Sequence, residues 1–304
     1  MAELFAALPK RVTVVEVGPR DGLQNEHTLI PTDRKVAFID ALSAAGLPVI
    51  ETTSMVSPAS VPQLADGEEV MRAIERRTGV RYPVLVPNER GLERARAAGA
   101  QEIAVFTAAS ETFNKRNINA SIAQSLERFA PVVAQAKQHD MRVRGYISTA
   151  FGCPYEGRIR PAAVVDIMLR LLELQIDEIS IGDTIGVATP SQVAELSALL
   201  LTRVDAGRLA LHFHDTRGTA LANVVAGLQS GVAIFDAAAG GLGGCPYAPG
   251  ASGNLATEDL IYMLDGMGIE TGVSLAGVVR ASSLLAQLVD HPLPSKYYQA
   301  ATSA

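Results

Sequence analysis

Two histidines one residue apart form the strongest chemical signal in this 304-residue chain. His212 and His214 flank Phe213 in a short apolar run that predicts a β-strand. Because alternate residues of a strand face the same side, both imidazoles can converge on one metal ion while Phe213 packs on the other side. Taken alone, the pattern fits two hydrogen-bonded core histidines equally well, so the metal hypothesis depends on further ligands.

Two residues far away in the sequence are the best candidates for those ligands. Asp21 follows the first predicted strand, and Asn254 ends a glycine-rich stretch. Two imidazoles, a carboxylate and an amide oxygen suit a hard divalent ion such as Mg²⁺ or Mn²⁺, whereas a zinc site more usually includes Cys or a third His. Asn254 by itself also fits the N-cap of the helix predicted after it.

The glycine-rich stretch covers residues 240–254 and contains six glycines and two prolines. Such a composition excludes regular helix or strand and predicts a loop. Loops of about fifteen residues are uncommon in compact domains and are usually functional. We expect this loop to be a lid that presents Cys245 and Asn254 to an active site.

Short apolar runs alternate with helical patterns along the chain. The strands are predicted at residues 12–17, 49–53, 82–86, 102–106, 142–148, 178–181, 209–214 and 232–237. The helices are predicted at residues 32–45, 62–77, 89–98, 121–139, 161–174, 190–203 and 217–229. Eight such repeats predict an α/β fold, a (β/α)₈ TIM barrel. A doubly wound open sheet is the alternative, but residues 18–22 lack the glycine spacing of its phosphate-binding turn.

Two further helical patterns, at residues 255–267 and 275–289, predict extra C-terminal helices packed at the barrel. No linker composition interrupts the chain, so we expect residues 1–304 to form a single catalytic domain. Active sites of TIM barrels lie at the C-terminal ends of the strands. The barrel should therefore gather Arg20, Asp21, Glu51, Asp183 and the histidine pair on one rim.

Bulk properties exclude several function classes. A formal charge of −6 gives no general attraction to nucleic acid or to an anionic membrane. No apolar run reaches the roughly 18 residues of a membrane span, and the N-terminal residues lack a signal peptide. Two cysteines do not make a disulfide framework, so we expect free thiols and a cytoplasmic protein. A homodimer is compatible with the sequence, although no interface motif is visible.

Several motifs together resemble those of the 3-hydroxy-3-methylglutaryl-CoA (HMG-CoA) lyase family, which are DRE-TIM-type metallolyases. The resemblance lies in residues 14–26, 49–54, 144–146, 182–186, 212–216 and 241–254, and it extends over nearly the full chain. The Arg-Asp-Gly opening is shared with a wider group of aldol and Claisen enzymes. The Gly-Gly-Cys-Pro-Tyr sequence of the loop is particular to the lyases.

The resemblance implies a (β/α)₈ barrel that cleaves HMG-CoA to acetyl-CoA and acetoacetate with Mg²⁺ or Mn²⁺, in leucine degradation. By matching motifs, the metal ligands of the family fall on Asp21, His212, His214 and Asn254. The catalytic arginine falls on Arg20, and the loop cysteine falls on Cys245.

The reaction assigns roles to the remaining rim residues. Arg20 is suited to hold the thioester oxygen as enolate charge develops, and Cys245 to protonate the enolate carbon. Asp183 is the preferred general base, and Glu51 is a partner of Arg20; a metal-bound water is an alternative base. Gln24 and Glu258 are expected to support the site from behind the ligands.

The CoA moiety calls for a local basic cluster in an otherwise acidic protein. Lys115, Arg116 and Asn117 follow the fourth predicted strand on the correct rim, so we expect them to contact CoA. Two alternatives keep the same fold. One is a lyase for a longer or related 3-hydroxy-3-alkylglutaryl-CoA, and the other is a Claisen-condensing acyl-CoA enzyme, which usually needs a further region after the barrel.

Overall fold

The computed structural model describes residues 8–244 and 253–303, so Cys245 lies outside the described residues. Nine parallel strands form one curled sheet in the order β2-β1-β11-β10-β9-β6-β5-β4-β3. They are β1 (Thr13–Glu16), β2 (Val49–Ile50), β3 (Thr53–Ser54), β4 (Val84–Leu85), β5 (Glu102–Ala108), β6 (Arg142–Ser148), β9 (Glu178–Asp183), β10 (Leu209–Phe213) and β11 (Ile234–Ala237). A separate antiparallel hairpin joins β7 (Gly152–Cys153) to β8 (Gly157–Arg158).

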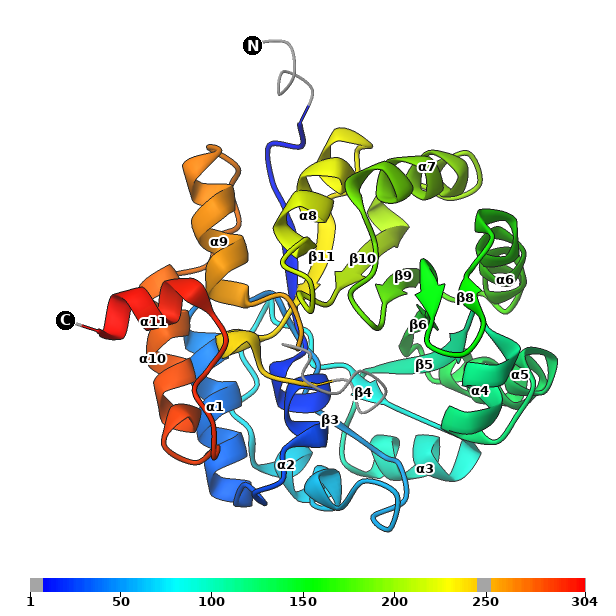
Figure 1. The fold of residues 1–304 in the computed structure, drawn as a ribbon. Helices are drawn as coiled ribbons and strands as arrows, with labels where there is room; N and C mark the ends of the chain where they lie inside the picture. The colour runs from blue at the N-terminus through cyan, green and yellow to red at the C-terminus, as the bar shows by residue number, and fades with distance from the viewer. Residues whose placement is uncertain (1–7, 245–252, 304) are drawn as a thin grey trace.

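The two ends of the sheet order are halves of one barrel strand. β2 pairs with β1, β3 pairs with β4, and only two residues separate β2 from β3. Backbone hydrogen bonds from Glu51 N to Glu16 O at 2.8 Å and from Thr52 N to Pro83 O at 3.0 Å bridge the interruption. Eight strand positions therefore close into the predicted (β/α)₈ barrel, whose helices surround the ring of strands (Figure 1).

The helices follow the strands in alternation. They are α1 (Thr32–Ala44), α2 (Gly67–Ala73), α3 (Glu89–Ala97), α4 (Glu111–Ile118), α5 (Ile122–Gln138), α6 (Pro161–Glu173), α7 (Pro190–Leu201), α8 (Ala220–Gln229), α9 (Thr257–Gly266), α10 (Leu275–Ala286) and α11 (Lys296–Thr302). Local sequence explains several of their starts. Pro161 and Pro190 stand in the first turns of α6 and α7, and Ser121 with Gln124 forms a capping box at α5.

Several details of the predicted elements were wrong. The single helix expected at residues 62–77 is a 3₁₀ turn, η4 (Pro62–Leu64), followed by the shorter α2. Helix α4 was missed because its sequence is largely polar, although Ser110 caps it by accepting a hydrogen bond from Phe113 N. The β7–β8 hairpin and α11 were also missed.

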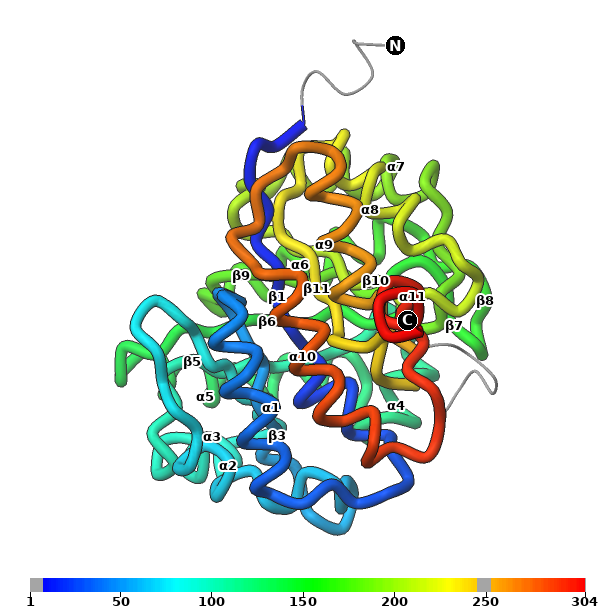
Figure 2. The backbone as a smooth tube through the Cα atoms, turned by 90° about the vertical axis from the view of Figure 1, so that its left-hand side faces the viewer, coloured from blue at the N-terminus to red at the C-terminus, as the bar shows by residue number. Residues whose placement is uncertain are grey.

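Two C-terminal helices pack against the other helices of the barrel. α10 lies beside α1, and α9 contacts α8 and α10 (Figure 2). The main apolar core fills the layer between strands and helices. Among the described residues, no helix has the length and hydropathy that crossing a membrane requires.

Candidate active site

The turn after β1 and the end of β10 place three metal-ligating groups together. Asp21 lies in η2 (Gly18–Gly22), a short π-helical turn that follows β1; His212 lies in β10, and His214 follows directly after its last residue. One ligand atom from each of Asp21, His212 and His214 lies within 4.8 Å of the other two. Strand β10 thus presents both imidazoles on one side, as the His-x-His spacing predicted, and Phe213 is buried in the apolar core on the other.

Asn254 reaches the same place because the returning chain pairs with the end of β10. His214 and Asn254 form an isolated antiparallel bridge, with Leu255 N donating to Phe213 O at 2.9 Å. The side chain of Asn254 is buried and donates from Nδ2 to Asp21 Oδ2 at 3.0 Å and to Leu242 O at 3.0 Å. The four residues expected as metal ligands are therefore neighbours.

The donor atoms of this cluster fit a hard divalent cation. His214 Nδ1 and Asn254 Oδ1 are both buried, and neither has a hydrogen-bond partner in the described part of the chain. Burial lowers the pKa of His214 to about 4, so its imidazole is neutral at neutral pH. Burial opposes ionisation of Asp21, but Arg20 and the histidines lower the pKa of that carboxyl to about 2. A cation would satisfy the two unpartnered atoms and the carboxylate together.

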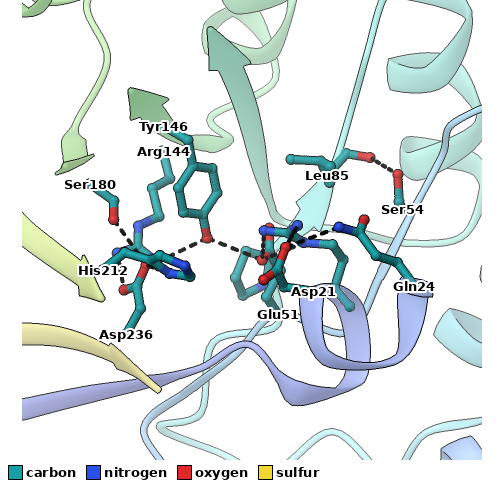
Figure 3. A network of polar contacts seen from close by, with 12 residues as sticks. Asp21, Gln24, Glu51, Ser54, Leu85, Arg144, Tyr146, Ser180, His212 and Asp236 are labelled. Atoms are coloured by element: carbon teal, nitrogen blue, oxygen red, sulfur yellow. Dashed lines mark hydrogen bonds and ion pairs between the residues drawn. The ribbon is translucent and has the colours of Figure 1, made fainter. Parts of the chain in front are cut away.

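Arg20 is fixed by two carboxylates at the edge of this cluster. Its Nε and Nη2 atoms each lie 2.7 Å from Glu51 Oε2, and its Nη1 lies 2.5 Å from Asp21 Oδ1. Burial alone would lower the pKa of Arg20, but Glu51 and Asp21 raise it, so the guanidinium stays charged. Tyr146 donates its hydroxyl to Glu51 Oε2 at 3.1 Å, which completes the support of the arginine (Figure 3).

Most of these groups open onto one cavity of about 740 Å³, and the exceptions are Asn254 and Glu51. Its lining includes Arg20, Asp21, Tyr146, His212 and His214. The cavity is large enough for the acyl part of a small thioester and one ion, and its wall combines apolar and polar side chains. Four of the six residues predicted to share one rim therefore line the same cavity, namely Arg20, Asp21, His212 and His214.

Asp183, the expected base, lies at the end of β9 but does not line this cavity. Its two carboxylate oxygens accept hydrogen bonds from Val187 N and Ala188 N, each at 2.9 Å. Burial raises the pKa of Asp183 to about 6. Glu51 differs, because its buried Oε1 has no hydrogen-bond partner in the described part of the chain.

The two residues expected to support the site do contact its framework. Gln24 donates from Nε2 to Asp21 Oδ1 at 3.2 Å. Glu258 is fully buried in α9, where its carboxylate oxygens accept from Gly240 N at 3.0 and 2.9 Å and from Ser282 Oγ at 2.5 Å. Glu258 therefore holds the start of the glycine-rich stretch.

The basic cluster occupies α4, beside the cavity. Arg116 and Asn117 line the main cavity, while Lys115 and Arg116 line a neighbouring one of about 410 Å³. All three side chains are exposed, and the Arg116 guanidinium lies over the Tyr155 ring, 4.1 Å from its centroid. This arrangement leaves cationic groups at the mouth of the site.

Cys245, the expected acid, lies outside the described residues, and so no contact can be assigned to it. Gly244, the residue before it, lines the main cavity and accepts a hydrogen bond from Asn25 Nδ2 at 2.8 Å. The chain therefore reaches the cavity immediately before Cys245.

Sequence reasoning missed the role of Tyr146. Its hydroxyl accepts from Arg144 Nη1 at 3.2 Å and donates to Glu51, so it links two buried charged groups. Burial raises the pKa of Tyr146 well above its ordinary value, which keeps the hydroxyl protonated. The alternation of Arg144 and Tyr146 on one strand, both polar in a buried run, was the available signal.

Comparisons with known proteins give one consistent set of relatives. The model of the HMGL-like family matches residues 11–285. A relative from Danio rerio, a cytoplasmic 3-hydroxy-3-methylglutaryl-CoA lyase, is 54% identical over 293 residues, which cover 96% of this chain and 88% of that protein. A mitochondrial hydroxymethylglutaryl-CoA lyase from Rattus norvegicus is 52% identical, with 97% and 91% covered. The solved HMG-CoA lyase of Bacillus subtilis superposes with a TM-score of 0.96 at 50% identity, covering 97% and 99%.

Proposed function

The chain belongs to the HMGL-like family, and from this premise we propose that it is a divalent-metal-dependent lyase that cleaves HMG-CoA to acetyl-CoA and acetoacetate. The observation that carries the proposal is the convergence of Asp21, His212, His214 and Asn254 beside a buried arginine, at a cavity that Asp21 and both histidines line. Its relatives at 52–54% identity, named as lyases of this substrate, support the same activity. The whole chain, residues 1–304, is taken as one catalytic domain that serves leucine degradation.

The four ligands would hold Mg²⁺ or Mn²⁺. Bound there, the ion supplies Lewis acidity to substrate oxygens, and so lowers the pKa of the C3 hydroxyl. The chemistry of these residues suits a cation. Asp21 is a full negative charge, and neutral His214 and Asn254 have lone pairs that accept no hydrogen bond in the described chain. The absence of thiolate from this set favours Mg²⁺ or Mn²⁺ over zinc.

Carbon–carbon cleavage requires one base and one acid. The base takes the proton of the C3 hydroxyl, the C2–C3 bond breaks, and its electron pair passes to C2, which becomes the enolate of acetyl-CoA. C3 becomes the ketone carbon of acetoacetate. Cys245 would then donate a proton to C2 and complete acetyl-CoA.

Arg20 is proposed to stabilise the enolate. Its charge is permanent, and the carboxylates of Glu51 and Asp21 fix its orientation before substrate binds. Donors held in place beforehand stabilise developing charge without the cost of reorganisation. The thioester oxygen is the atom on which that charge accumulates.

Two carboxylates compete for the role of base. A pKa of about 6 suits Asp183 to proton transfer near neutral pH, but both of its oxygens hold the turn after β9. Glu51 offers an unpartnered Oε1, and burial raises its pKa although Arg20 opposes this. We propose Asp183 as the base, with Glu51 as the alternative.

The decisive experiment measures acetyl-CoA release from purified protein with HMG-CoA and with a longer 3-hydroxy-3-alkylglutaryl-CoA. We expect cleavage of HMG-CoA that requires Mg²⁺ or Mn²⁺, disappears with EDTA and is lost in His212→Ala. Preference for the longer chain would change the substrate but not the reaction. Absence of cleavage by protein that binds metal would contradict the proposal and point to the condensing direction.

Compartment and assembly are further predictions. Similar relatives are named as cytoplasmic in one case and mitochondrial in another, and we propose a cytoplasmic enzyme, which cell fractionation tests. The substrate partner is an acyl-CoA, and neither nucleic acid nor membrane is expected to bind. A homodimer is compatible with the sequence, and light scattering coupled to gel filtration tests it.

A further inference from the structure

A buried carboxylate stands directly behind one of the histidines. Asp236 lies in β11, only 1% exposed, and it is the cross-strand partner of His212 in the parallel register of β10 and β11. Its Oδ2 lies 3.3 Å from His212 Nδ1. Figure 3 shows Asp236 on the side of the imidazole remote from Asp21.

Two other side chains hold this carboxylate in place. Ser180 in β9 donates its hydroxyl to Asp236 Oδ2 at 2.9 Å, and Arg144 in β6 donates from Nη2 to Oδ1 at 2.5 Å. Arg144 is only 1% exposed, and its Nε also lies 3.0 Å from Glu178 Oε1. Asp236 is therefore an ionised acceptor with fixed orientation at the bottom of the site.

The partners of Asp236 determine which nitrogen of His212 carries the proton. A carboxylate that accepts from Ser180 and Arg144 has only acceptor capacity left for the imidazole, so Nδ1 of His212 must be the donor. The lone pair of a neutral ring then lies on Nε2. That nitrogen is available to a cation held with Asp21 and His214.

We propose that Asp236 is a positioning residue for the metal site, which fixes the ring orientation and the Nδ1–H tautomer of His212. The inference rests on the proposed function only in taking His212 as a metal ligand. It requires nothing about the substrate. Outer partners of this kind typically change metal affinity by about 10- to 100-fold when they are lost.

Asp236→Asn is the informative substitution, because it keeps the shape of the side chain and replaces one acceptor oxygen by an NH₂ donor. Arg144 has only donors, so the amide oxygen of the new side chain must face Arg144. Its NH₂ group then faces Ser180 and His212 Nδ1. The imidazole must then accept a hydrogen bond at Nδ1 and carry its proton on Nε2. That proton occupies the nitrogen whose lone pair would bind the metal.

The first measurement is a titration with Mn²⁺ alone, with free Mn²⁺ followed by electron paramagnetic resonance. We expect Asp236→Asn to bind Mn²⁺ about 10- to 100-fold more weakly than the unsubstituted protein, with an unchanged circular dichroism spectrum. An affinity within about threefold of the unsubstituted protein would overturn the inference. Protein that binds Mn²⁺ but fails to cleave HMG-CoA would contradict the proposed function and leave this inference standing.

The second measurement needs no variant and therefore decides the matter even if Asp236→Asn does not fold. Long-range ¹⁵N–¹H spectra of metal-free protein report the tautomer of each of the five histidines. His212 is expected as the Nδ1–H tautomer, and it is assigned by its disappearance in His212→Gln. A protonated Nε2 with a bare Nδ1 would overturn the inference.

Glu178→Gln is the matched control. Glu178 pairs with the same Arg144 on the side away from His212. The substitution therefore disturbs the buried ion network but leaves the acceptor oxygen of Asp236 in place at the imidazole. We expect a lower melting temperature with unchanged Mn²⁺ affinity. Equal loss of Mn²⁺ affinity in Glu178→Gln and Asp236→Asn would show general damage to the network and would contradict the proposed role.

Discussion

Asn254 donates a hydrogen bond to Asp21 across 233 residues of sequence, and the same amide leaves its oxygen without a partner in the described chain. The donor half of the amide thus orients the carboxylate, while the buried acceptor half is available to a cation. A single side chain therefore couples the turn after β1 to the end of the glycine-rich stretch.

Asn254→Ala should weaken Mn²⁺ binding by more than the roughly 10- to 100-fold expected for an outer partner, because it removes a ligand and releases Asp21. Calorimetric titration with Mn²⁺ measures this. Asn25→Ala is the control, since it removes an amide that bonds Gly244 O and leaves the ligands intact. Equal Mn²⁺ affinity in Asn254→Ala and the unsubstituted protein would exclude Asn254 as a ligand.

Arg20→Lys should lower kcat by about 10²- to 10³-fold with a small change in KM, because the donors act on charge that develops in the transition state. Lysine keeps the charge but cannot pair with Glu51 and Asp21 through a planar fork. Steady-state kinetics at saturating Mn²⁺ test it. Arg94→Lys, which alters an ion pair with Glu68 on the helical layer, should stay within about twofold. A large rise in KM with unchanged kcat would assign Arg20 to ground-state binding instead.

The positions of the candidate ligands could be predicted because the barrel rule needs only the order of elements. Once the strands ending before Arg20 and at His214 are recognised, their C-terminal ends must share one rim. The loop composition similarly placed Asn254 near that rim. These inferences depend on residue type and spacing, which the sequence contains.

Side-chain contacts across neighbouring strands could not be predicted in the same way. Asp236 is one carboxylate in an apolar run, and its contact with His212 depends on the register in which β10 and β11 pair. The strand containing Glu51 was predicted as continuous, whereas it breaks between β2 and β3. The sequence predicts Asp183 as a base at a strand end, but it does not show that Val187 N and Ala188 N donate to its carboxylate. Those two hydrogen bonds form only when the turn folds.

Asp183→Asn and Glu51→Gln should separate the two candidate bases. If Asp183 is the base, its substitution lowers kcat by about 10²- to 10⁴-fold. A base must be deprotonated, so kcat of the unsubstituted protein should fall as pH drops through about 6. This fall, the acidic limb of the pH profile, should be absent in Asp183→Asn. The pH profile of kcat at saturating Mn²⁺ measures it.

The opposite pattern identifies Glu51. Retention of the acidic limb in Asp183→Asn, with loss of that limb in Glu51→Gln, would transfer the role to the carboxylate with the unpartnered oxygen. Melting temperatures of both variants provide the control. Asp183 also holds the turn after β9, and a purely structural loss would change stability without removing a limb of the profile.

Arg116→Ala should raise KM for HMG-CoA several-fold and leave kcat unchanged, because a phosphate contact far from the reacting carbons is equally strong in the ground and transition states. The increase should shrink at high ionic strength, since exposed charges are screened. Arg128 lies on α5 and also lines the cavity. Arg128→Ala therefore serves as the comparison, because it removes the same charge from a different helix. An unchanged KM in Arg116→Ala at low salt would remove α4 from the CoA site.

Glu16→Gln should make the protein less sensitive to rising pH. Glu16 is buried and accepts from Gly18 N, Ala239 N and Thr257 Oγ at 2.8, 2.8 and 2.7 Å, yet burial raises its pKa to about 7. The folded protein therefore binds a proton at Glu16 that the unfolded chain releases near its ordinary pKa of 4.5. This contribution to stability is complete below pH 4.5 and is lost as pH rises through about 7.

Between pH 5 and pH 8 the melting temperature of Glu16→Gln should gain about 5 °C relative to the unsubstituted protein. Differential scanning calorimetry at both pH values measures the gain, and the comparison cancels the titration of groups that do not interact with Glu16. Glu93→Gln, on the exposed face of α3, should show no such gain. If the melting temperatures of Glu16→Gln and the unsubstituted protein run parallel from pH 5 to pH 8, then Glu16 is ionised throughout, and its three hydrogen bonds outweigh its burial.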